Sequence, residues 1–243
     1  MSYEAFFDSF MQHPLLLWAA ALLGLTIALS RRGLSRSLRW FCVALTILSL
    51  LDAWLTTTRI PGIGPLSGAA ASLVPLAFVL LGDFRYFVFI ESARSDGTLA
   101  ASVRGLLRAC AWTLLVPLGS QLLVTALDLD EPRMLFLVYE VLFVLLSLAI
   151  AALYLPRRAS DPRWTLRVTR LVIGYYVLWA AADAIILTTG DDMGFLLRVI
   201  PNVLYYGGFV PMIAWTAPPA ARPAMGYTRR TCGKNDLRAS RFG

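Results

Sequence analysis

Seven long apolar runs constrain this chain more than any other feature. Each has the roughly 17 to 25 residues that an α-helix needs to cross about 30 Å of hydrocarbon. An open sheet is excluded, because it would leave backbone amides unpaired in lipid. The runs therefore predict an all-α integral membrane protein with seven transmembrane helices. They lie at residues 14–30, 40–58, 68–90, 106–127, 134–156, 167–189 and 194–217.

The composition agrees with this class. Of the 243 residues, 58% are hydrophobic and 15% are charged, whereas soluble domains are about half apolar and about a quarter charged. The first thirteen residues carry Glu4 and Asp8 where a secretory signal peptide would carry Lys or Arg. We therefore expect the first run to be a span that is not cleaved. Its Gly24 and several alanines indicate close contact with another helix.

The basic residues predict the orientation, because cytoplasmic loops retain Lys and Arg. Most of the 22 basic residues follow the first, third, fifth and seventh runs, and acids such as Asp128 and Asp191 follow the even runs. The N-terminus is thus expected outside a bacterial-type inner membrane. Residues 218–243 would form a basic, disordered cytoplasmic tail. The net charge of +7 fits contact with anionic headgroups rather than with nucleic acid.

Two hairpins of the chain resemble each other. Asp52 and Asp183 are each followed by a pair of threonines, and Pro75 and Pro201 each precede a glycine by seven residues. Each hairpin would belong to a copy of three helices, and the single helix between the two copies would keep both in one orientation. This predicts a parallel repeat within a transmembrane domain of residues 1–217. Its parts would be repeat 1 at about 14–90, a linker helix at 106–127 and repeat 2 at about 134–217.

Polar residues within the runs predict a binding site. At a rise of about 1.5 Å per residue, polar side chains from five of the spans reach one level in the outer half of the bundle. Such groups are costly in hydrocarbon and usually face a protein interior or a wet cavity. We therefore predict a site for a small polar or cationic solute. Its residues would be Asp52, Gln121, Glu140, Asp183, Arg198 and Asn202.

The charges of this layer suggest what it could hold. Three carboxylates against one guanidinium suit a cation, a proton relay or a hydroxyl-rich solute. We expect Asp183 and Arg198 to face each other across a short turn. The alternative is that Arg198 only neutralises an acid and the other polar groups bond between helices. Arg85, near the inner end of its run, is expected to extend its charge to the membrane surface.

The sequence gives little support for catalysis or for a cofactor. An aspartyl protease needs two carboxylates close enough to share a proton, and Asp83 is expected to lie far deeper than Asp52. One histidine, His13, and three cysteines are too few for a typical zinc site. A retinal protein needs a lysine within a span, whereas the single lysine, Lys234, is in the tail. We expect no metal and no cofactor.

One segment carries a family resemblance. Residues 200–204, Ile-Pro-Asn-Val-Leu, follow an acidic turn and precede glycines. This segment is similar to the seventh helix of the SWEET sugar transporters, which are PQ-loop-like and share the three-plus-one-plus-three plan. In that family the asparagine after this proline helps to bind sugar, so the resemblance implies this role for Asn202. The residue after Pro75 is Leu76, and the proline-rich signature of the family's first helix is missing.

Two interpretations of different class follow. The first is a transporter or channel for a small polar or cationic solute, which works by rocking of two repeats around the polar layer. The alternative is an inner-membrane sensor or assembly subunit without transport activity, whose tail contacts a cytoplasmic partner. The lipid bilayer is a partner in both, and a homo-oligomer is compatible with either.

Overall fold

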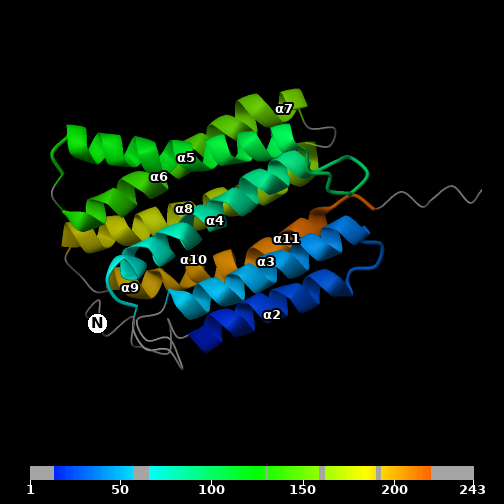
Figure 1. Ribbon diagram of the computed structural model, residues 1–243, viewed down its shortest axis with the longest axis horizontal. Coiled ribbons are helices and arrows are strands. Elements are labelled where there is room, and N and C mark those ends of the chain that lie inside the picture. The colour runs from blue at the N-terminus through cyan, green and yellow to red at the C-terminus, as the bar shows by residue number, and fades with distance from the viewer. Residues whose placement is uncertain (1–13, 57–65, 130, 159–161, 190–192, 220–243) are drawn as a thin grey trace, which may run out of the picture.

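The computed structural model of the protein describes residues 14–56, 66–129, 131–158, 162–189 and 193–219. Helices are the only named regular elements of these residues, and one isolated bridge joins Ala93 to Leu99. The helices run roughly along one axis and form a single bundle (Figure 1). The prediction of an all-α protein is confirmed for this part of the chain.

Five of the predicted spans are continuous helices. They are α2 (Pro14–Ser30), α3 (Arg36–Leu55), α4 (Ala69–Ser92), α5 (Val103–Ala126) and α8 (Pro162–Thr189). The sequence places several of their ends. Ser35 caps α3 by accepting a hydrogen bond from the Leu38 amide, and Ser102 caps α5 in the same way.

The other two predicted spans contain a π-helical turn each. The fifth comprises α6 (Pro132–Ala149), the π-helix η2 (Ile150–Tyr154) and α7 (Leu155–Arg158). The last comprises α9 (Met193–Leu197), α10 (Val199–Val203), the π-helix η3 (Leu204–Gly208) and α11 (Phe209–Thr216). Six helical segments of the described chain are long and apolar enough to cross a membrane, and α2 is a shorter apolar helix. This supports a multi-pass membrane protein.

The spans pack in chain order and close into a ring. Each packs on the next, and the last, through η3 and α11, packs on α2. Helix α5, the predicted linker, contacts both α4 and α6 on one side of the bundle, whereas α2 meets η3 and α11 directly on the other. The two predicted repeats are therefore joined through α5 on one side and are in direct contact on the other. This packing does not establish the repeat.

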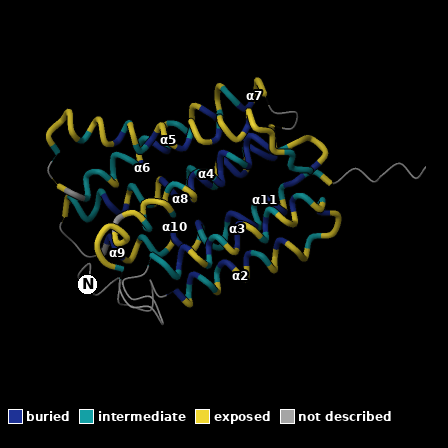
Figure 2. The backbone as a smooth tube through the Cα atoms, in the orientation of Figure 1, coloured by how far each residue is buried: buried dark blue, intermediate teal, exposed yellow. Residues whose placement is uncertain are grey.

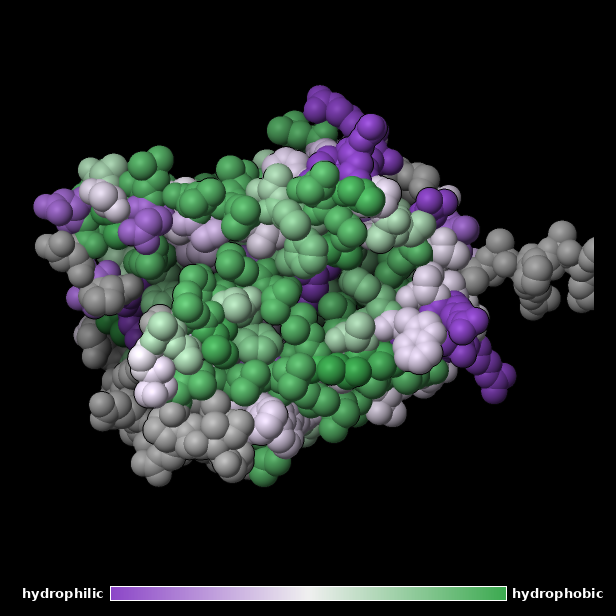
Figure 3. Space-filling view, viewed as in Figure 1, coloured by the Kyte–Doolittle hydropathy of each residue, from purple (hydrophilic) through white to green (hydrophobic). Residues whose placement is uncertain are grey.

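The surface has the distribution expected in a membrane. Buried residues lie on the helix faces that point into the bundle, and exposed residues lie on the outer faces (Figure 2). The face seen in Figure 3 is covered mainly by apolar residues, and hydrophilic residues gather toward its two ends. Leu107, Leu118 and Leu122 are among the exposed apolar side chains. Contact with lipid explains this exposure, because the outer faces of membrane-spanning helices lie against hydrocarbon and not against water.

A core of aromatic residues fills the half of the bundle that contains α7 and α11. Trp164 of α8 donates a hydrogen bond of 2.9 Å to the carbonyl of Ile213, and its ring lies 5.1 Å from that of Phe89 between centroids. Phe143 stacks on Tyr176 with centroids 4.0 Å apart. These side chains join α4, α6, α8 and α11, so this half of the bundle is tightly closed.

Helix α2 approaches the last span closely, as the small residues of the first run predict. A Cβ atom at Gly24 would overlap the carbonyl oxygen of Gly207, and one at Gly207 would lie 2.8 Å from the carbonyl oxygen of Ala20. Only glycine leaves room for this backbone contact. The close approach holds η3, and the tyrosines within it, against the bundle.

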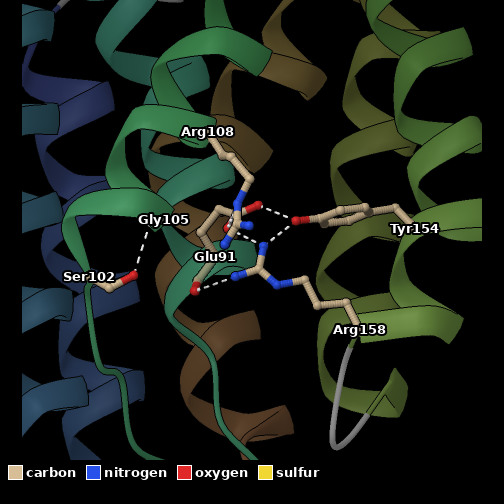
Figure 4. Close-up of polar contacts among 6 residues, drawn as sticks. All are labelled: Glu91, Ser102, Gly105, Arg108, Tyr154 and Arg158. Atoms are coloured by element: carbon tan, nitrogen blue, oxygen red, sulfur yellow. Dashed lines mark hydrogen bonds and ion pairs between the residues drawn. The ribbon is translucent and has the colours of Figure 1, made fainter.

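A buried carboxylate ties three helices together at the α7 end (Figure 4). Glu91 of α4 has a side chain that is 1% exposed, and it forms ion pairs with Arg108 of α5, at 3.0 Å, and with Arg158 of α7. The hydroxyl of Tyr154 donates to it at 2.5 Å. Charge-assisted bonds of this kind are among the stronger ones in proteins. Glu91 therefore fastens α4 to α5 and α7.

Candidate binding cavity

A cavity of about 570 Å³ occupies the half of the bundle opposite the aromatic core. Its wall comes from α3, α4, α5, α6, α8 and the last span. This volume lies within the range of about 300 to 1,000 Å³ that is common for small-molecule sites. Five of the six predicted site residues line it. They are Asp52, Gln121, Glu140, Arg198 and Asn202.

Asp183, the sixth predicted residue, lies behind this wall. It is fully buried, and one of its oxygens, Oδ1, binds Nη1 of Arg198 and, at 3.1 Å, Nη1 of Arg133. The predicted pairing of Asp183 with Arg198 is confirmed. Asp183 does not line the cavity, but it anchors a residue that does.

Arg133, which immediately precedes the predicted run at residues 134–156, is a second partner of Asp183. It follows Pro132 in the first turn of α6, where the helix directs it toward α8 and α9. Its guanidinium lies 4.8 Å from the ring centroid of Phe195 as well as against Asp183. Proline is common at the first position of a helix. Pro132 could therefore have predicted that the helix begins before Arg133 and that Arg133 belongs to the bundle.

Glu140 presents a buried carboxylate to the cavity. It is 5% exposed, and its Oε2 atom has no hydrogen-bond partner among the described residues. Gln121 is instead exposed and bonds weakly, at 3.4 Å, to Thr125 on its own helix. Gln121 thus stands at the open side of the cavity, whereas Glu140 belongs to its interior.

Aromatic side chains position the other two polar residues of the wall. The hydroxyl of Tyr206 donates to Oδ2 of Asp52 at 2.9 Å. The hydroxyl of Thr56 donates to the backbone carbonyl of Asp52 at 2.6 Å and also lies 3.3 Å from Oδ1. The indole nitrogen of Trp179 donates to Oδ1 of Asn202 at 2.9 Å. Both polar groups are therefore held in fixed orientations at the cavity surface.

The π-helical turn η3 brings two consecutive tyrosines to the cavity. Neighbouring residues of a regular α-helix point about 100° apart, at about 3.6 residues per turn, so one of a pair usually points away from a site. Tyr205 and Tyr206 both line this cavity. Single π-turns occur often at functional sites. The site predicted from the sequence does not include these two tyrosines, which belong to the Tyr-Tyr-Gly-Gly segment after Pro201.

Arg85 corrects a prediction. It does not extend to the membrane surface but is 4% exposed, with its guanidinium 3.8 Å from the centroid of the Tyr205 ring. Nη2 donates to the Tyr205 carbonyl at 3.0 Å, and Nη1 donates to Ser49 at 3.4 Å. The reason lies at Gly82, where any Cβ would overlap the Tyr205 hydroxyl. This glycine lets Tyr205 lie across α4 and cover the charge.

Asp83 lies in the same layer behind the cavity. It accepts hydrogen bonds from the hydroxyls of Tyr139 and Tyr176, two residues that line the cavity. Asp83 and Arg85 are both buried, and no direct bond joins them in the described structure. Together with Tyr205, these groups form a polar floor between the cavity and the aromatic core.

The charges of this half of the bundle do not balance. Four carboxylates, of Asp52, Asp83, Glu140 and Asp183, stand against the guanidinium groups of Arg85, Arg133 and Arg198. With all groups ionised, one negative charge is in excess. Within the described segments no three His, Cys, Asp or Glu side chains lie close enough to hold a metal ion. The cavity therefore suits a molecule that carries positive charge or donates hydrogen bonds.

No known relative identifies the protein. Comparison with protein families, with characterised proteins and with solved structures finds no match. The similarity of residues 200–204 to SWEET transporters stays a hypothesis.

Proposed function

We propose that the protein is a transporter or channel for a small polar or cationic solute in a bacterial-type inner membrane. The observation that carries this proposal is the cavity of about 570 Å³ whose wall combines Asp52, Glu140, Arg198 and Asn202. Ionisable residues within membrane spans are rare and commonly line solute or ion pathways. In this proposal the predicted parallel repeat provides two halves that rock around the cavity.

Passage through the bundle would require the floor to open. Tyr139, Tyr176 and Tyr205 line the cavity and bind the buried Asp83 and Arg85 behind it. Beyond them, the Glu91 cluster joins α4, α5 and α7. A transporter would separate these contacts in each cycle. The same closed floor favours the alternative, a membrane sensor that binds its ligand without moving it.

Uptake into proteoliposomes distinguishes the two functions. A panel of labelled monosaccharides, amino acids and organic amines should contain a solute whose accumulation requires the protein. Asp52→Asn should lower that uptake by about tenfold or more, since one lost charge-assisted hydrogen bond is about 1.5 to 3 kcal/mol. Asn202→Ala should lower uptake by about two- to tenfold, since a hydrogen bond of a neutral amide is about 0.5 to 1.5 kcal/mol. Binding of a solute without its uptake would favour the sensor.

Asp96→Asn is the matched control for the Asp52 variant. Asp96 is exposed in the connection between α4 and α5, at the end away from the cavity. Hydrogen bonds from the hydroxyl and amide of Thr98 lower the pKa of its carboxyl. Uptake should be unchanged in this variant. An equal loss in both variants would mean that Asp52 acts through the general charge of the protein and not at the cavity.

The proposed orientation has its own test. With the cavity half outside, a Ser67→Cys variant should react with a membrane-impermeant thiol reagent in intact cells, because Ser67 is exposed just before α4. Ser95→Cys, exposed at the opposite end, is the control and should react only after the cells are opened. The reverse pattern would place the N-terminus and the cavity on the cytoplasmic side. Cys232, expected to be protected, lies outside the described residues.

A further inference from the structure

We propose that the cavity binds an organic monocation, with an ammonium group against Glu140 and an apolar body between the aromatic rings. This inference rests on the proposed function and names the class of its solute. It is carried by three features of the cavity: an unsatisfied carboxylate, an excess of one negative charge when all groups are ionised, and a wall of aromatic side chains.

Glu140 is the acceptor of this site. Buried polar atoms nearly always have a hydrogen-bond partner, and each exception needs a reason. Oε2 of Glu140 has none among the described residues, although the residue is 5% exposed and faces the cavity. Arg133 and Arg198, the nearest sources of positive charge, both bind Asp183 instead. Oε2 itself is buried, so a ligand ammonium group would approach the Glu140 carboxylate from the cavity that the residue lines and compensate its charge.

The charge of the ligand follows from the surrounding groups. A single positive charge would neutralise the excess left by four carboxylates and three guanidinium groups. A neutral ligand would leave that excess uncompensated, and an anion would double it. Asp52, on the α3 side of the cavity, already accepts hydrogen bonds from Tyr206 and Thr56. Glu140, on α6, is therefore the position with unused capacity for the ammonium group.

The size and polarity of the wall indicate an organic ion rather than a bare one. Trp179 lies at the centre of an aromatic group, with its ring centroid 5.3 Å from that of Tyr176 and 5.4 Å from that of Tyr205. Such rings attract cations through their faces. Leu76, Val79 and other apolar side chains complete the wall. A small ion would leave most of the cavity of about 570 Å³ empty.

Three probes of one shape test the charge. Benzylammonium, benzyl alcohol and benzoate share a phenyl ring and carry charges of +1, 0 and −1 at about pH 7, where amines are protonated and carboxylic acids are ionised. Isothermal titration of the purified full chain in detergent should show benzylammonium binding at least tenfold more tightly than the other two. Equal binding of the three probes, or no binding of benzylammonium, would overturn the proposal.

Glu140→Gln tests the position of the ammonium group. This variant should weaken benzylammonium binding by about tenfold or more, the effect of about 1.4 kcal/mol, and should narrow the difference from benzyl alcohol. Glu131→Gln is the matched control, since Glu131 precedes the same helix and is exposed outside the cavity wall. Unchanged binding in Glu140→Gln, or an equal loss in both variants, would remove Glu140 from the site.

Thermal unfolding distinguishes a ligand-binding role of Glu140 from a purely structural one. Without ligand, Glu140→Gln should raise Tm, because it removes a buried charge that lacks a hydrogen-bond partner. The same variant should lose the rise in Tm that benzylammonium produces in the unmodified protein. A lower Tm without ligand would mean that Glu140 is satisfied within the folded protein and is not an empty acceptor.

The outcomes separate this inference from the proposed function. Benzylammonium binding that depends on Glu140, without uptake of any amine, would support the inference and contradict transport. Protein-dependent uptake of a neutral sugar, without binding of benzylammonium, would support transport and contradict the inference.

Discussion

Replacing both arginines that bind Asp183 should destabilise the protein by about 3 to 5 kcal/mol, the usual cost of leaving a buried charge without its partner. Asp183 is fully buried, and Arg133 and Arg198 both contact its Oδ1 atom. The variant is Arg133→Met together with Arg198→Met, in which methionine preserves much of the apolar stem. Either single variant should lose much less, because the remaining arginine still neutralises the carboxylate.

Chemical unfolding in detergent, with Asp183→Asn added to the double variant, measures this coupling. The added change should recover part of the lost stability, since a neutral amide needs no counter-charge. Arg94→Met together with Arg104→Met, at exposed positions in the other half of the bundle, controls for the loss of two positive charges. If Asp183→Asn only adds its own loss to that of the double variant, the three residues do not act as a unit.

Gly24→Ala should destabilise the protein by roughly 1 to 3 kcal/mol, the range for overpacking of a close contact. The added methyl group would overlap the backbone carbonyl of Gly207, and backbone cannot rotate away as a side chain can. Helix α2 would have to move from η3, which carries Tyr205 and Tyr206. The loss should therefore extend to benzylammonium binding, measured by titration in parallel with the unfolding experiment.

Gly174→Ala is the matched control for this prediction. Gly174 also lies within a spanning helix, α8, but a Cβ atom there would meet no atom within 4 Å. This substitution should leave stability unchanged or raise it by about 0.5 to 1 kcal/mol, because glycine is a poor helix former. Similar losses at both positions would mean that helix propensity or the detergent, and not the contact with Gly207, determines the result.

The grouping of most candidate residues around one cavity was predictable from their positions along the helices. A helix rises by a fixed distance per residue, and the hydrocarbon layer has nearly constant thickness. Counting residues from the ends of the apolar runs was therefore enough to place Asp52, Glu140, Arg198 and Asn202 at one level. All four line the cavity. The pairing of Asp183 with Arg198 was predictable too, because a short turn joins their helices.

The direction in which each side chain points from its helix was harder to predict than its position along the helix. The rotation of each helix about its axis depends on its neighbours, and the chain order of the ring is not encoded in any single run. Arg85 was expected at the surface, yet Gly82 allows Tyr205 to cover it. Asp83 is absent from the predicted site because it was expected to lie far deeper than Asp52, yet two tyrosines of the cavity wall donate hydrogen bonds to it.

The sequence by itself determined that this chain forms apolar helices that carry ionisable residues, because helix length and hydrophobicity are local properties. Only the tertiary structure decided which charges meet. It brought Arg133 to Asp183, turned Tyr205 and Tyr206 together through η3, and left the Oε2 atom of Glu140 without a partner. These relations depend on packing between helices that are distant in sequence, where small residues such as Gly24 and Gly82 set how closely the backbones approach.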